Sequence, residues 1–177
     1  MSVVTAIINL LTQQKNGNKM TTTTITRGEA IEAIDASIFN VTNGIDLNDS
    51  TVEVIVFAVN NDLQIRDYLI GLPNSYTLEE CSSFLAYIAS KVSDESRYAF
   101  DTVNAMYNYE LEDVESCKFL ISQAYEANPD YSLTKLVSRV LSAGWAFDSF
   151  ASMRNELAPK VIENINEDLD YVIGEDN

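Results

Sequence analysis

Residues 110–144, ELEDVESCKFLISQAYEANPDYSLTKLVSRVLSAG, decide the fold. Apolar residues recur there every three or four positions on both sides of an Asn-Pro-Asp turn at 128–130, a period typical of two amphipathic helices. Asp113 suits the position before the first helix, and Ser132 suits the start of the second. Gly144 suits the left-handed position that ends a helix. The stretch therefore predicts a helical hairpin.

The chain on both sides of this hairpin shows the same helical period. Thr26 with Glu29, and Thr77 with Glu80, have the spacing of capping boxes, in which each side chain satisfies a free backbone amide of the other residue. The first box predicts a helix over 27–39. Further helix starts are expected at Ser50, at Asn61 or Asp62, and at Ser93. Together these patterns predict an all-α fold, a single domain of about eight short antiparallel helices.

Residues 51–59, TVEVIVFAV, allow two interpretations. Their β-branched residues alternate, as in a strand. However, Ser50 and Glu53 have capping-box spacing, and the chain contains no second strand-like run. An isolated strand would leave its backbone groups without partners. We therefore predict a helix here.

The two ends of the chain differ from its middle. Residues 2–13 could form a short helix, and a polar, threonine-rich stretch follows. Near the other end we expect a helix over 149–157 and a separate final helix that Pro159 begins, since proline suits a first helical turn. We divide the chain into a leader helix and Thr-rich linker (1–25), a helical domain (26–174) and an acidic tail end (175–177).

The net charge of −16 is unevenly distributed, because residues 1–40 carry three basic and three acidic residues. The acidic excess therefore lies beyond residue 40. Such a surface repels nucleic-acid backbones and anionic membranes, so we expect no direct binding to DNA, RNA or membranes. No apolar run is long enough to span a bilayer, and no signal-peptide pattern is present. We expect a cytoplasmic protein of unknown oligomeric state.

The residues available for catalysis are few. The chain has no histidine, which removes the commonest general base and zinc ligand. Cys81 and Cys117 have apolar neighbours and are expected to be buried free thiols. Glu110, Glu112, Asp113 and Glu115 cluster before one helix, either as a divalent-cation site or acidic contact surface, or because acids complement the helix dipole. We expect no cofactor and no enzymatic activity.

Three segments carry a resemblance to a known family. They are IRDYL at 65–69, AFDTVNAMY at 99–107 and ESCKFLISQAYEANPDYSLTKLVSRVLSAGW at 115–145. The region 65–145 resembles the C-terminal helical half of the actinobacterial and actinophage family known as domain of unknown function 4192. The chain lacks that family's larger N-terminal half and is rich in Asn and Tyr where members are rich in Ala and Arg. The resemblance implies a truncated, phage-encoded relative, with chance helical similarity as the alternative, and implies no activity.

The hairpin also resembles a tetratricopeptide unit, counted back from Pro129 as its closing proline. Small residues then fall where two helices approach closely, at Ala105, Cys117 and Ala124. Asn104 and Asn108 depart from the large apolar and aromatic residues of that pattern, and no second copy recurs. The resemblance implies one degenerate unit in a tetratricopeptide-like helical stack. Such stacks form grooves that bind segments of partner proteins.

Five tyrosines lie around one helical hairpin, namely Tyr98, Tyr107, Tyr109, Tyr125 and Tyr131. Either they straddle core and surface, with hydroxyls that reach water, or they mark a partner-binding patch, where tyrosine is enriched. The candidate partner-binding residues are Tyr107, Tyr109, Tyr125, Tyr131, Glu112 and Asp113.

These observations favour a non-enzymatic helical protein-interaction module that binds a protein partner in the groove beside residues 113–144. The alternative is an acidic mimic of nucleic acid that blocks a DNA- or RNA-binding protein, which the charge of −16 suggests. A further alternative is an enzyme that uses carboxylates and a divalent metal.

Overall fold

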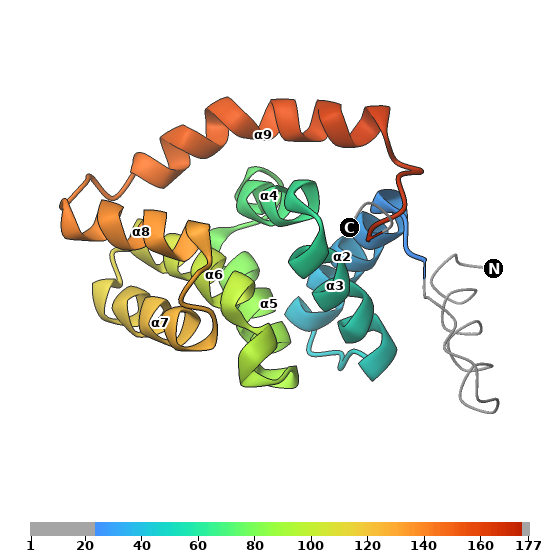
Figure 1. Cartoon of the computed structure of the whole chain (residues 1–177), viewed down its shortest axis with the longest axis horizontal. Helices are drawn as coiled ribbons and strands as arrows, with labels where there is room; N and C mark the ends of the chain where they lie inside the picture. The colour runs from blue at the N-terminus through green and yellow to red at the C-terminus, as the bar shows by residue number, and fades with distance from the viewer. Residues whose placement is uncertain (1–23, 175–177) are drawn as a thin grey trace.

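The computed structural model describes residues 24–174 and contains eight α-helices in that range (Figure 1). No β-strand occurs among these described residues, and the all-α single domain predicted from the sequence is confirmed. The predicted leader helix at 2–13 lies outside the described residues. The helices are α2 (Arg27–Thr42), α3 (Asp49–Asn61), α4 (Leu63–Gly71), α5 (Leu78–Lys91), α6 (Tyr98–Glu110), α7 (Val114–Ala127), α8 (Ser132–Ser142) and α9 (Ser149–Glu167), with short 3-10 turns η1 (Leu72–Asn74) and η2 (Asp94–Ser96).

Most of the predicted helix starts are confirmed. Both capping boxes form, at Thr26 before α2 and at Thr77 before α5. Residues 51–59 are helical, as predicted, but the cap of α3 is Asn48, whose Oδ1 accepts the amide of Thr51 at 2.8 Å. The Ser50 cap is therefore wrong, because Asn48 satisfies the free amides two residues earlier.

Two other predicted helix starts, at Ser93 and at Pro159, are also wrong. Ser93 precedes only the 3-10 turn η2, without a side-chain cap, and α6 begins at Tyr98. Pro159 does not begin a helix, because it lies inside the continuous helix α9. Proline removes one backbone donor, yet α9 buries residues on both sides of it, Ala158 and Ile165. This packing keeps the helix continuous.

The helix α6 lies at the centre of the domain. Ten of its 13 residues are buried, and it contributes to both apolar clusters of the core. α7 packs mainly against α6, and α5, α8 and α9 also contact α6. The two helices of the stretch 110–144 that follow α6, namely α7 and α8, therefore pack on α6 as well as on each other.

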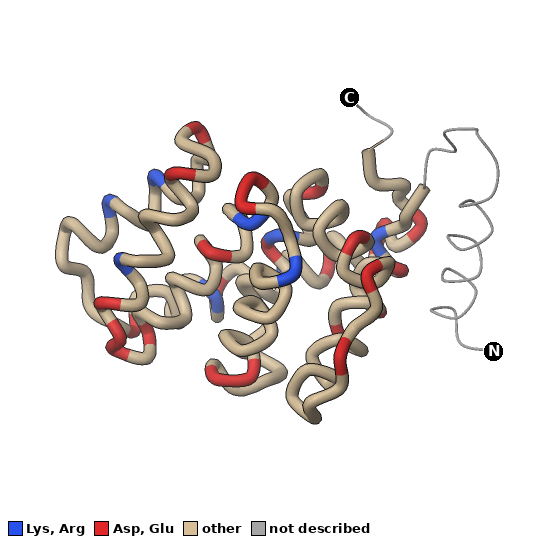
Figure 2. The backbone as a smooth tube through the Cα atoms, turned by 90° about the horizontal axis from the view of Figure 1, so that it is seen from below, with Lys and Arg blue, Asp and Glu red and all other residues tan. Residues whose placement is uncertain are grey.

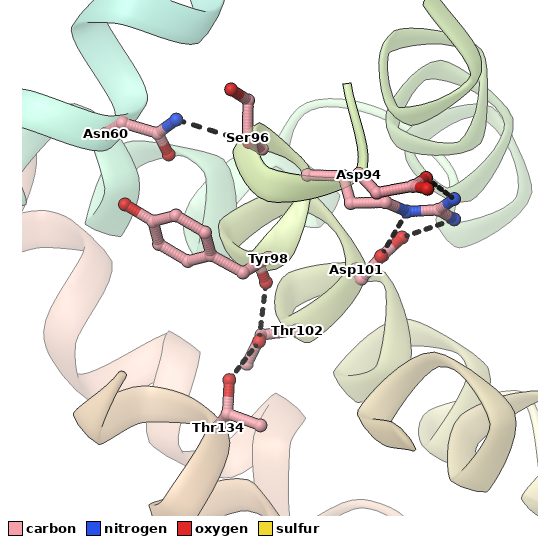
Figure 3. Close-up of polar contacts among 8 residues, drawn as sticks. Asn60, Asp94, Ser96, Tyr98, Asp101, Thr102 and Thr134 are labelled. Atoms are coloured by element: carbon pink, nitrogen blue, oxygen red, sulfur yellow. Dashed lines mark hydrogen bonds and ion pairs between the residues drawn. The ribbon is translucent and has the colours of Figure 1, made fainter. Parts of the chain in front are cut away.

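Buried polar residues of α6 each find a partner, as a helix buried on all sides requires. The carboxylate of Asp101 accepts a hydrogen bond from Arg97 Nε at 2.6 Å. The hydroxyls of Thr102 and Thr134 lie 2.7 Å apart and join α6 to α8, as Figure 3 shows. Asn104 accepts a hydrogen bond from Ser82 of α5. These contacts connect the central helix to its neighbours.

The helix α9 runs along one side of the molecule, from the end of α8 across α4 to α2 (Figure 1). A Cβ placed on Gly71 would lie 3.4 Å from that of Ala158, so α4 and α9 approach closely there. Beyond α9 the chain returns to the segment just before α2, where the amide of Ile173 donates to the carbonyl of Ile25. The predicted helix end near Gly174 is therefore wrong, since α9 ends at Glu167.

Candidate functional site

A groove of about 360 Å³ lies between α4, α8 and α9. Its apolar walls come from all three helices. They are formed by Ile70, Leu133, Leu136, Met153, Leu157 and Val161. Apolar concave sites with a few polar groups are the usual form of binding sites. The groove adjoins the segment 113–144 that the sequence singled out, because α8 supplies one of its walls.

Two leucines give the groove its exposed apolar character. Leu136 of α8 is 52% exposed and Leu157 of α9 is 47% exposed. A single exposed leucine on a surface is ordinary, whereas two exposed leucines that line one concavity from different helices indicate a binding surface. A partner can therefore bury both at once.

The α9 wall depends on the continuity of that helix. Met153, Leu157 and Val161 line the groove at intervals of four residues and so share one helical face. The sequence predicted two separate helices on either side of Pro159, so it did not place Met153, Leu157 and Val161 on one helical face. The spacing of the three apolar residues was the available signal.

Basic side chains surround the apolar walls. Arg66, Arg154 and Lys160 line the groove together with one acid, Asp67. Arg66 Nε donates to Asp67 at 2.8 Å. Among the residues described, Lys160 has no carboxylate within ion-pair distance. None of these residues was among the partner-binding candidates predicted from the sequence, because their proximity arises only in the fold.

Arg154 of α9 is bound to the central helix α6 through Glu110. Its Nη1 and Nη2 donate to the two carboxylate oxygens of Glu110 at 2.6 and 2.9 Å. Burial works against the charge of Arg154, but the hydrogen bonds and the charge of Glu110 outweigh it and raise the pKa of Arg154. The pair fixes α9 on α6 and so positions one wall of the groove.

Two of the candidate tyrosines are core residues. Tyr107 is fully buried, and its hydroxyl donates to the carbonyl of Leu69. Tyr109 is 5% exposed, and its hydroxyl donates to the carbonyl of Trp145. We expected these hydroxyls to reach water. Instead, they donate to backbone carbonyls of elements that are distant in the sequence. Neither side chain is accessible to a partner in this structure.

The other two candidate tyrosines differ from each other. Tyr125 is exposed on α7. Tyr131 is half-buried, packs edge-on against Tyr98 with ring centroids 4.7 Å apart, and lies beside the groove residue Arg66. Burial raises the pKa of Tyr131 to about 12, although the Arg66 charge works in the opposite direction. Tyr131 therefore lies next to the groove without lining it.

The acidic candidates lie in the turn between α6 and α7. Glu112 is exposed with a left-handed φ of 62°. Asp113 caps α7 by accepting the amide of Ser116 at 3.0 Å, and hydrogen bonding from the Ser116 side chain and then from this amide lowers the pKa of its carboxyl. Glu110 belongs to the buried pair with Arg154. The fold therefore buries the Glu110 carboxylate and leaves its acidic neighbours in the sequence exposed.

Other acids also have structural roles, such as Asp62, which caps α4, and Asp101, which pairs with Arg97. Between residues 24 and 174, no three side chains of the metal-binding types gather where they could hold an ion. Figure 2 shows the Asp and Glu residues distributed over many elements. The nucleic-acid-mimic and metal-enzyme alternatives stay predictions.

Both cysteines are buried and free, as predicted. Burial raises the pKa of the Cys81 thiol to about 12 and that of Cys117 to about 11. Thiols in such environments keep their protons and are poor nucleophiles. Their role is packing.

A second depression, of about 620 Å³, is more open and lies between α3 and the segment from Lys91 to Ser96. It is bordered by charged residues of both signs, Asp49, Glu53 and Lys91. The groove between α4, α8 and α9 offers more apolar surface and is the stronger candidate.

None of the helices between residues 24 and 174 has the length and apolar character that a membrane-spanning helix needs.

Comparison of the sequence with protein-family models and with curated proteins, and of the chain with solved structures, gives no match. The resemblance to the domain of unknown function 4192 family therefore stays a prediction.

Proposed function

We propose that this chain is a non-enzymatic protein-interaction module whose groove between α4, α8 and α9 binds an apolar segment of a partner protein. One observation carries the proposal: Leu136 and Leu157, each about half exposed, line the same concavity from two helices. A groove of this kind fits an amphipathic helix or a short apolar peptide.

The expected affinity is modest. Complete burial of one leucine side chain contributes about 1.5–3 kcal/mol, and here half of each leucine is already buried in the free protein. Association and side-chain ordering consume much of that gain. We therefore expect micromolar binding, typical of a reversible interaction.

A random peptide library displayed on particles tests this proposal without knowledge of the partner. Peptides are selected on the immobilised full chain and then compared on two variants. Leu136→Asp places a charge in the groove, whereas Phe119→Asp makes the same kind of change at a 61% exposed residue of α7 that does not line it. Binding should survive Phe119→Asp and be lost in Leu136→Asp. Equal binding to both variants, or no enrichment on the full chain, would overturn the proposal.

A further inference from the structure

We infer that the segment bound in this groove is acidic as well as apolar, with a carboxylate beside its apolar anchors that pairs with Lys160 and Arg66. This inference rests on the proposed function and specifies the chemistry of the partner. It follows from the charges around the groove, which differ from those of the rest of the chain.

Basic residues outnumber acidic ones around the groove, whereas acidic residues predominate in the whole chain. The whole chain has 11 basic and 27 acidic residues, whereas the groove is lined by three basic residues and one acid. Two of the basic residues, Arg66 and Arg154, already have carboxylate partners in Asp67 and Glu110. Lys160 supplies the free positive charge.

The three cations differ in how they can act on a ligand. Arg154 is 7% exposed and committed to Glu110, so it is a positioning residue for the wall. The Arg66 side chain is 15% exposed, its Nε and Nη2 donate to Asp67, and Tyr131 lies close to it, so it lines the groove as a charge that is already partly paired. Lys160 is exposed and unpaired within the described range. A carboxylate between Lys160 and Arg66 would make charge-assisted hydrogen bonds next to apolar walls that exclude water.

Long-range electrostatics work against the same ligand. A net charge of −16 repels an acidic peptide as it approaches, and salt screens that repulsion over about 10 Å at 0.1 M ionic strength. Close contacts in the groove are screened less. The salt dependence of binding therefore mixes two opposite effects, and the local pairing is better tested by reversing single charges.

The experiment uses peptides selected on the full chain and a matched pair of charge variants. Lys160→Glu reverses a groove charge, and Lys118→Glu makes the same change in net charge on α7, at a 64% exposed lysine outside the groove. Each selected peptide is synthesised in its original form and with every Asp and Glu replaced by the amide. Dissociation constants are measured by fluorescence anisotropy, and circular dichroism confirms folding.

We expect the selected peptides to be rich in Asp and Glu, and the amide forms to bind the natural chain about five- to tenfold more weakly. That preference should disappear in Lys160→Glu and persist in Lys118→Glu. Equal binding of both peptide forms to the natural chain, or equal effects of the two variants, would overturn the inference. If the peptides bind Leu136→Asp unchanged, the proposed function itself fails, which is a distinct outcome.

Discussion

Arg154 of α9 and Glu110 of α6, 44 residues apart in the chain, form a two-point ion pair in which both side chains are less than a tenth exposed. The pair joins the helix that walls the groove to the central helix of the core. The geometry of the groove therefore depends on an electrostatic contact inside the protein.

Replacing Glu110 with glutamine should lower the free energy of unfolding by about 3 kcal/mol, because it leaves the Arg154 charge buried without a counter-charge. Urea unfolding followed by circular dichroism measures the change. The control is Glu115→Gln, at the exposed pair with Lys118, which should leave the unfolding midpoint unchanged. Equal effects of the two substitutions would show that the buried pair has no special role.

The hydroxyl pair of Thr102 and Thr134 predicts an unusual double-mutant result (Figure 3). Thr102→Val leaves the buried Thr134 hydroxyl without a partner and should cost about 1–3 kcal/mol of unfolding free energy. Adding Thr134→Val removes that unpaired group, so the double variant should be more stable than the single one. Additive losses in urea unfolding would contradict this account.

The position of Pro159 inside α9 predicts that Pro159→Ala stabilises the protein, by up to about 3 kcal/mol, because alanine restores a backbone donor within the helix. Were Pro159 the first residue of a separate helix, its missing donor would cost nothing, and alanine would be neutral or destabilising. Thermal unfolding midpoints of the two chains distinguish these cases.

Stability should fall at alkaline pH as buried thiols resist ionisation. The Cys81 thiol has an ordinary pKa near 9 when unfolded and about 12 in the fold. Between these values the folded state binds more protons than the unfolded state, so stability is present below about pH 9 and is lost as pH rises toward 12. Cys81→Ala should reduce the loss between pH 8 and pH 10 in urea unfolding. An unchanged slope would contradict this assignment.

Local signals predicted where several helices begin. The boxes at Thr26 and Thr77 and the cap at Asp113 act within three residues of themselves, so the sequence contains the whole interaction. The helix at 51–59 was predictable for a different reason. A strand there would have had no partner, and the fold places Ile55 and Ala58 in the core instead.

The groove and the central role of α6 were not predictable from these signals. Asp101 resembles an exposed residue in the sequence, yet Arg97 allows it to be buried. Tyr107 bonds to a carbonyl 38 residues away, a contact that no local pattern reveals. Pro159 usually marks a boundary, and packing against α4 overrides that preference. Tertiary contacts therefore decided the features on which the proposed site depends.

The chain offers a direct probe of the groove, because only four methionines are present and they differ in position. Met153 lines the groove, whereas Met106 is 1% exposed in the core. With methyl-labelled methionine, two-dimensional NMR can follow both signals while a selected peptide is added, and Met153→Leu assigns the groove signal. The account predicts that the Met153 methyl signal shifts in proportion to the bound fraction and that the Met106 signal changes much less. A peptide that binds without moving the Met153 signal would contradict the claim that this groove is the binding site.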